Sequence, residues 1–294
     1  MYQEKTFFGK LKVFGIFGFI PLFAFCTVIV LPFLIGIYMT FTDWNGSASN
    51  SSYLGFVNYA DAVRDPAFWT SMWLTLKYVV VNLILTNVLA FVLALLVTSG
   101  FKGQNFFRAG FFTPNLIGGI ILGFVWQFIF SRVLVYFGSE FGWGLFSSSW
   151  LGDPDKALWA LIVVGVWQNA GYMMLIYVAG LIGISGSLTE AAGLDGASWL
   201  RQLFSIKIPL MIPSFTISLF LTLQKSFMVY DTNLSLTKGD PFRSTELIAM
   251  HVYNEAFVNQ NLGPGQAKAF ILFAIVAIIA ILQVSAMKKA EVEA

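Results

Sequence analysis

The chain has 294 residues, of which 57% are hydrophobic and only 11% are charged. Soluble domains carry about 25% charged residues, so this chain lacks the polar surface of a water-soluble protein and is predicted to lie in a membrane. A formal net charge of +2 excludes a strongly basic nucleic-acid-binding domain. A single cysteine, Cys26, and a single histidine, His251, exclude an intrachain disulfide and a multi-histidine metal site. We expect His251 to be a solvated loop side chain.

Six apolar stretches are long enough to cross a bilayer as helices, which takes roughly 20 residues each. They lack the alternation of polar and apolar residues that is typical of a transmembrane β-barrel, so the predicted class is an all-α membrane protein with one transmembrane domain over residues 1–294. The first stretch is longer than the roughly 7–15 apolar residues of a cleavable signal peptide, which indicates a retained signal anchor. In chain order, the predicted spans are residues 13–41, 72–98, 109–130, 157–184, 210–230 and 269–287.

The distribution of lysine and arginine predicts the orientation, because these residues accumulate on the cytoplasmic side. Six spans place both termini on one side. That side contains Lys5, Lys10, Lys12, Lys102, Arg108, Arg201, Lys207, Lys288 and Lys289, whereas the other contains Arg64, Arg132, Lys156, Lys238, Arg243 and Lys268. We therefore expect cytoplasmic termini. Residues 231–268 would then form the longest outer loop, with a short amphipathic helix between Thr245 and Phe257.

A polar segment, residues 187–209, separates the fourth and fifth spans on the cytoplasmic side. Ser187 and Glu190 fit a capping box that begins a helix, and Asp195-Gly196 would end it with a left-handed glycine. A second helix would run to about Ile206 and stop before Pro209. It carries more apolar residues than so short a loop buries. Two interpretations remain open: a helix lying on the inner leaflet, or a docking element for a cytoplasmic partner.

The residue pattern of this segment resembles the EAA loop of binding-protein-dependent ABC importer permeases. Glu190-Ala191-Ala192 is followed after three residues by Gly196 and after nine more by Ile206-x-Ile208-Pro209, with isoleucine in place of the leucine before the proline. The resemblance covers nearly the whole chain and is to the MalF-type carbohydrate branch. Its other motifs are Leu54–Tyr59, Asp65–Trp69, Phe107–Pro114, Trp126–Phe130, Ala179–Leu181 and Leu236–Pro241.

The resemblance implies the MalF/MalG-like fold and a permease subunit of an ATP-binding-cassette importer in the bacterial cell (inner) membrane. Such a subunit would move a sugar of the oligosaccharide class into the cytoplasm by ATP-driven alternating access. The implied partners are a second homologous permease in a heterodimer, two cytoplasmic ATPase subunits and an extracellular solute-binding protein. The implied ATPase-coupling residues are Glu190, Ala191, Ala192, Gly193, Asp195 and Gly196. The chain has no Gly-x-x-x-x-Gly-Lys-Ser/Thr phosphate loop, so we expect no catalytic residues and no cofactor here, with ATP and Mg²⁺ on the partner ATPase.

Polar residues inside the predicted spans are candidates for the substrate path, because polar groups in hydrocarbon face the bundle interior. We expect Asn82, Asn87 and Gln127 to form interhelical hydrogen bonds. Lys225 must either pair with an acid or line a wet cavity, and Asp231, six residues later, is a poor partner along one helix. The predicted path residues are Asn169, Gln224, Lys225 and Tyr230.

An alternative function is an ATP-independent secondary transporter or channel for a polar solute. It would explain the spans and the buried lysine, but it leaves the EAA spelling without a role. A membrane-bound enzyme is a third class, and the lack of a histidine or cysteine cluster argues against it.

Overall fold

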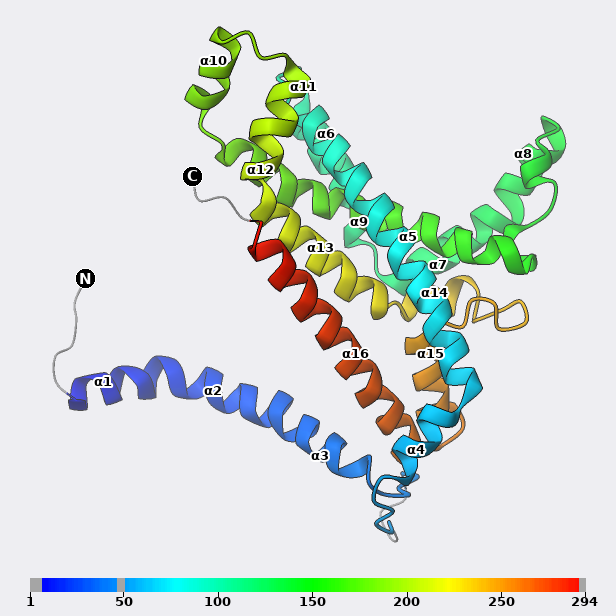
Figure 1. The fold of residues 1–294 in the computed structure, drawn as a ribbon. Helices are drawn as coiled ribbons and strands as arrows, with labels where there is room; N and C mark the ends of the chain where they lie inside the picture. The colour runs from blue at the N-terminus through cyan, green and yellow to red at the C-terminus, as the bar shows by residue number, and fades with distance from the viewer. Residues whose placement is uncertain (1–6, 47–50, 291–294) are drawn as a thin grey trace. The chain divides into compact units, whose positions relative to one another are not determined.

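The computed structural model describes residues 7–46 and 51–290 (Figure 1). Within these ranges the chain is helical apart from turns, loops and one isolated bridge between Thr42 and Tyr53, which confirms the predicted all-α class. Lys5, which contributed to the predicted orientation, lies outside the described residues. The chain forms two compact units, one made of Met1–Asp65 with Val252–Ile271 and the other of Pro66–His251 with Leu272–Ala294.

Within the described residues, five helices could each cross a membrane, and a bent pair of helices could form a sixth span. Five are long and apolar enough on their own, and a sixth candidate is a broken pair, Trp199–Leu210 and Ile212–Phe227, bent by 69°. The five are Phe8–Met39, Pro66–Val97, Gly119–Glu140, Pro154–Gly183 and Leu262–Lys288. Several of these helices begin a few residues before the predicted apolar stretch.

The third predicted span, residues 109–130, does not form one helix. α6 (Gln104–Phe112) leads into a 3₁₀ turn (Thr113–Leu116), and Ile117 and Gly118 are extended, with ψ angles of 124° and 141°. α7 (Gly119–Phe128) then starts a new helix, which continues through a π-helical turn (Ile129–Val133) into α8 (Leu134–Glu140). Pro114 lacks an N–H group for a continuous helix, and apolar character alone does not reveal such a break.

The fifth predicted span, residues 210–230, is also shorter than expected. Its helix, α13, covers only Ile212–Phe227, and the chain bends at Met211, directly before Ile212-Pro213. A proline is favourable in the first turn of a helix and unfavourable within one, so the bend falls where Pro213 begins the new helix.

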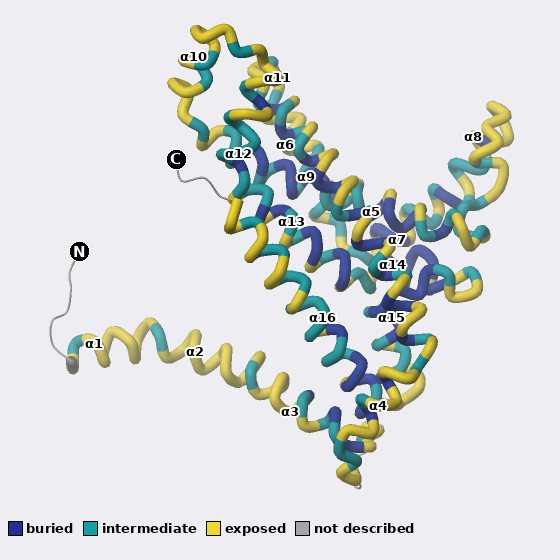
Figure 2. The backbone as a smooth tube through the Cα atoms, in the orientation of Figure 1, coloured by how far each residue is buried: buried dark blue, intermediate teal, exposed yellow. Residues whose placement is uncertain are grey.

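The first unit contains a long amino-terminal helix. It consists of α1 (Phe7–Val13), α2 (Phe19–Phe25) and α3 (Leu31–Met39), joined by π-helical turns at Phe14–Gly18 and Cys26–Val30. α4 (Val57–Arg64) is held to the end of α3 by Asn58, whose amide nitrogen donates to the carbonyls of Thr40 and Thr42 at 2.9 and 2.8 Å. Figure 2 shows α1–α3 almost entirely exposed, so their apolar side chains are available to lipid.

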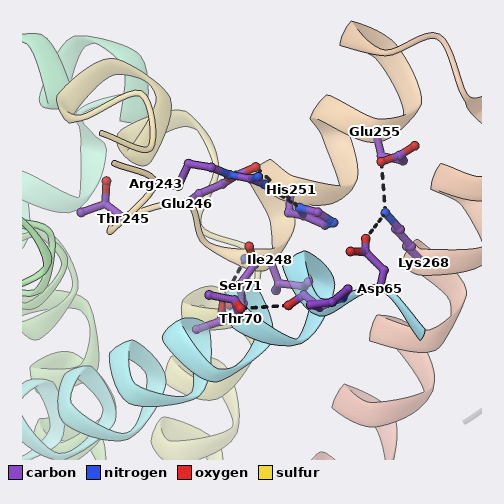
Figure 3. A network of polar contacts seen from close by, with 12 residues as sticks. Asp65, Thr70, Ser71, Arg243, Thr245, Glu246, Ile248, His251, Glu255 and Lys268 are labelled. Carbon is purple, nitrogen blue, oxygen red and sulfur yellow. Dashed lines mark hydrogen bonds and ion pairs between the residues drawn. The ribbon is translucent and has the colours of Figure 1, made fainter. Parts of the chain in front are cut away.

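A buried ion cluster closes the first unit. The Nζ atom of Lys268, a residue only 6% exposed, lies 2.7 Å from Asp65 Oδ2 and 3.0 Å from Glu255 Oε2 (Figure 3). Lys268 belongs to α16 (Leu262–Lys288), and Glu255 belongs to the π-helical turn (Asn254–Val258) after α15 (Ile248–Tyr253). The lysine thus joins its own part of the chain to Asp65, 203 residues earlier in the sequence.

The second unit is built around two long helices, α5 (Pro66–Val97) and α9 (Pro154–Gly183), with α13 packed against both. Two small residues of α5, Ala90 and Ala94, are fully buried in the core that it shares with α9. Two 3₁₀ turns, Gly144–Phe146 and Trp150–Gly152, connect α8 to α9. The buried core consists of Ala90, Ala94, Val97, Met173, Met174, Tyr177, Val178 and Met211.

Polar residues tie these three helices together. Asn87 on α5 accepts hydrogen bonds from the hydroxyls of Tyr177 on α9 and Ser218 on α13 at 2.7 and 2.6 Å, and Asn82 donates to Ser226 at 2.8 Å. The prediction of interhelical hydrogen bonds is confirmed for Asn82 and Asn87. Among the described residues, the side chain of Gln127 makes none.

The predicted outer loop, residues 231–268, contains ordered and buried structure. α14 (Asp231–Leu236) packs against α7, where the hydroxyl of Ser235 donates to the carbonyl of Gly119 at 3.2 Å. Asn233 is buried and donates to the carbonyl of Thr245 at 2.9 Å. The prediction that His251 is solvated is wrong: it is 5% exposed, and its Nδ1 atom lies 3.6 Å from Glu246 Oε1 (Figure 3). His251 lies on the inner face of α15 against Phe68, with a ring-centroid distance of 6.2 Å.

Candidate functional site

A helical hairpin between α9 and α13 carries all six residues of the predicted coupling segment. Its first helix, α10, spans Gly186–Leu194. Its second helix, α11 (Trp199–Gln202), continues through a π-helical turn (Leu203–Lys207) into α12 (Ile208–Leu210). We call residues 186–210 the handle, and Figure 1 shows α10 and α11 projecting from one end of the second unit.

The turn of the handle has the geometry that the sequence predicted. Gly196 adopts a left-handed conformation with φ of +77°, which glycine tolerates without steric cost. Its N–H donates to the carbonyl of Gly193 at 3.1 Å, and the N–H of Ala197 donates to the carbonyl of Ala192 at 2.9 Å. These two bonds form the left-handed cap that ends α10 and fix the direction in which α11 leaves it.

The start of the handle differs from the predicted capping box. Ser185, not Ser187, occupies the N-cap position, and the hydroxyl of Ser187 lies 2.7 Å from that of Ser185. The helix therefore begins two residues earlier, because α9 ends at Gly183 and leaves only a short connection. Among the described residues, Glu190 makes no side-chain hydrogen bond or ion pair, so its carboxylate is available to another molecule.

The end of the handle does not stop before Pro209 as predicted. Instead, the N–H of Ile208 bonds the carbonyl of Leu203 in a widened π-helical turn. This turn directly precedes Pro209, which has no N–H to donate. The wider turn accommodates the proline without ending the helix, and the chain bends two residues later at Met211.

The handle exposes large apolar side chains. Leu194 at the end of α10 is 91% exposed, and Trp199 on α11 is 55% exposed. No residue of α10 is buried (Figure 2). Leu200 and Phe204 are exposed as well. An exposed apolar cluster of this kind is typical of an interaction surface.

A second candidate site is a cavity of about 340 Å³ within the second unit. It lies where α9, α13 and the start of α14 meet residues at the break before α7. The cavity brings together all four residues predicted for the substrate path, Asn169, Gln224, Lys225 and Tyr230. The remaining lining residues are Asn115, Gly119, Gln168, Met228, Val229, Asp231 and Thr232.

Lys225 is held in this cavity by uncharged groups. Its Nζ atom donates to Oδ1 of Asn169 at 3.1 Å and lies 4.7 Å from the centre of the Tyr172 ring. The amide nitrogen of Asn169 in turn donates to the carbonyl of Gly165 at 2.9 Å, which orients the amide oxygen toward the lysine. The ammonium group keeps further donors, and it has an aromatic face beside it.

Sequence reasoning missed part of this cavity. Gln168 donates from Nε2 to the carbonyl of Ile117 at 3.0 Å, and Asn115 donates to the carbonyl of Gln168 at 3.5 Å. The first bond satisfies a carbonyl freed by the break before α7. Asn115 and Gly119, on either side of that break, also line the cavity. Pro114 together with Gly118-Gly119 was the available signal for that break.

Comparison with known proteins identifies the family. The model of the binding-protein-dependent transport system inner membrane component matches residues 86–289. The chain belongs to this family. It is thus a multi-pass component of the inner membrane, as the resemblance of its EAA segment implied, and its relatives are permease subunits rather than enzymes.

Individual relatives cover nearly the full length. The chain is 40% identical to the probable starch degradation products transport system permease protein AmyD of Thermoanaerobacterium thermosulfurigenes, over all of both chains. It is 30% identical to the multiple sugar-binding transport system permease protein MsmF of Streptococcus mutans, covering 94% of this chain and 95% of MsmF.

A solved structure has the same fold. A chain of a bacterial ABC transporter involved in the import of the acidic polysaccharide alginate superposes with a TM-score of 0.83 at 18% identity, covering 96% of this chain and 98% of that one. This likeness confirms the predicted importer permease fold.

Proposed function

We propose that this chain is the membrane-spanning subunit of an ATP-driven importer that carries a saccharide, of the oligosaccharide class, into the cytoplasm. The names of two relatives refer to starch degradation products and to multiple sugars. The substrate crosses between this subunit and a second, homologous permease. Both termini and the handle lie on the cytoplasmic side, in keeping with the excess of lysine and arginine there.

The handle is the observation that carries this proposal. Its glycine turn is fixed by two backbone hydrogen bonds, Glu190 has no partner among the described residues, and Leu194 is almost fully exposed. A rigid hairpin with an apolar tip and a free carboxylate fits a cleft in a soluble partner that offers apolar walls and a basic group. In this proposal Glu190, Ala191, Ala192, Gly193, Asp195 and Gly196 dock on an ATPase subunit.

The connection between the handle and the cavity gives the coupling a physical path. α11 and α12 lead through the 69° bend at Met211 into α13, and α13 carries Gln224 and Lys225 into the cavity. A displacement of the handle by the ATPase therefore moves the helix that supplies half of the proposed substrate contacts. Asn169 and Tyr230 supply the others from α9 and from the start of α14.

Other subunits supply what this chain lacks. Two cytoplasmic ATPase subunits bind ATP and Mg²⁺, and an extracellular solute-binding protein delivers the saccharide. No cofactor is assigned to this chain. A complex of such a permease with a periplasmic binding protein is known for the alginate importer.

Co-purification tests the proposal. The tagged chain is expressed in a membrane with its genomic neighbours, and the retained subunits are identified by mass spectrometry. We expect an ATPase and a second permease in the wild type, and loss of the ATPase alone in Glu190→Lys. Lys102→Gln, an exposed charge outside the handle, is the matched control. If the wild-type chain retains no ATPase, the proposal is wrong.

A further inference from the structure

The cavity contains one cationic and one anionic side chain that do not pair with each other. Lys225 and Asp231 both line it. Lys225 donates to Asn169, and neither residue takes part in an ion pair among the described residues. The carboxylate of Asp231 likewise has no hydrogen bond within the described part of the chain. Asp231 is exposed and Lys225 is half-buried, so water or a ligand can reach both charges in the cavity.

The fold keeps these two charges apart. α13 ends at Phe227 and α14 begins at Asp231, so three residues outside a helix separate the turn of Lys225 from Asp231. The hydrogen bond to Asn169 and the ring of Tyr172 hold the ammonium group on the side of α9. Asp231 lies in the first turn of α14, where a carboxylate is favourable next to the helix dipole. This accounts for an acid at that position, but not for an acid that shares a small cavity with an unpaired lysine.

We propose that Asp231 is a specificity residue that makes this cavity select neutral saccharides over acidic ones, an inference that rests on the proposed function. A sugar hydroxyl both donates and accepts, so a polyhydroxylated ligand donates to the Asp231 carboxylate and accepts from the Lys225 ammonium group. Asn169 and Gln224 add amide donors and acceptors. Such a ligand thus gives hydrogen-bond partners to both the Lys225 ammonium group and the Asp231 carboxylate.

An acidic saccharide is attracted by Lys225 but repelled by Asp231. A uronate carboxylate gains an ion pair with Lys225, but it enters a cavity where Asp231 carries the same charge. Specificity against a competitor often comes from such a repulsive element rather than from better contacts to the preferred ligand. Removal of the Asp231 charge leaves Lys225 as the only charged group of the lining, which favours the acidic ligand.

Direct binding to the importer complex without its solute-binding protein tests this inference, because the binding protein would impose its own selectivity. Dissociation constants for maltotriose and for trigalacturonate are measured by thermophoresis in nanodiscs. In Asp231→Asn we expect the preference to shift toward trigalacturonate on the order of tenfold. In Lys225→Gln we expect a shift in the opposite direction.

Two variants serve as controls. Asp231→Glu keeps the charge and should keep the wild-type preference, which separates a charge effect from a folding defect at α14. Asp61→Asn removes an exposed acid of α4 that does not line the cavity, and it should change nothing. If wild-type protein binds maltotriose and the preference is the same in both cavity variants, this inference is wrong while the proposed function stands. If the wild type retains its ATPase but binds neither saccharide, the saccharide assignment fails as well.

Discussion

The ammonium group of Lys225 lies 3.1 Å from the amide oxygen of Asn169, a residue 56 positions earlier on another helix. Lys225 has no ion-pair partner among the described residues. Its ammonium group is stabilised by the amide dipole of Asn169 and by the face of the Tyr172 ring. This arrangement costs less than an unpaired charge in hydrocarbon and leaves the lysine available to a ligand.

Replacement of this lysine should reduce transport without reducing assembly. In Lys225→Ala we expect uptake of labelled oligosaccharide to fall on the order of tenfold, because a hydrogen bond from a charged group to a ligand contributes roughly 1.5–3 kcal/mol. Lys77→Ala is the control, since that lysine stacks on Trp73 at 5.7 Å and does not line the cavity. Unchanged uptake by a correctly assembled Lys225→Ala complex would remove Lys225 from the path.

The left-handed turn of the handle should not accept a side chain. In Gly196→Ala we expect the turn to be strained by about 1–2 kcal/mol, although nothing lies within 4 Å of the added carbon. Faster amide hydrogen exchange at Ala197, whose N–H caps α10, would report the loosened turn, and uptake should fall. Gly186→Ala is the matched control, because its added carbon is equally free of contacts and its φ is not positive. Equal exchange rates in the two variants would show that the turn is not a constraint.

The exposed tip of α10 should matter for docking and not for folding. Leu194→Asp replaces a side chain that is 91% exposed, so we expect the free energy of unfolding of the isolated chain to change by less than about 0.5 kcal/mol. Retention of the ATPase subunit in co-purification should be lost, because a charge would enter an apolar contact. A variant that keeps both its stability and its ATPase would exclude Leu194 from the interface.

The buried lysine of the first unit should be required for stability. Lys268→Met leaves the carboxylates of Asp65 and Glu255 without their shared cation, and breaking a buried pair in this way costs about 3–5 kcal/mol. Thermal unfolding in nanodiscs measures the loss, with Lys102→Met as an exposed control. Addition of Asp65→Asn and Glu255→Gln to Lys268→Met should recover part of the loss, since it removes the repulsion between the two carboxylates. A melting temperature unchanged in Lys268→Met would contradict this role.

Some features could be predicted from local sequence because they depend on local physics. Apolar length predicts membrane helices, and the left-handed turn at Gly196 is predicted by a glycine directly after a helical stretch. The same local reasoning predicted that Lys225 pairs with an acid or lines a wet cavity, and Lys225 does line a cavity.

Two of the failures depend on contacts between residues that are distant in sequence. His251 was predicted to be a solvated loop side chain, but it is buried against Phe68 and close to Glu246. The span predicted at residues 109–130 breaks where Gln168 of α9 satisfies the carbonyl of Ile117.

By itself, the sequence determined that this chain is a helical membrane protein with a glycine-capped hairpin between its fourth and fifth apolar stretches. The tertiary structure decided which polar residues meet in one cavity. It set Lys225 against Asn169 and brought Asp231 into the lining of the same cavity, and it paired Lys268 with two acids. The reason is physical: helix formation and capping depend on neighbours within a few residues, whereas the position of a charge depends on which distant helix packs against it.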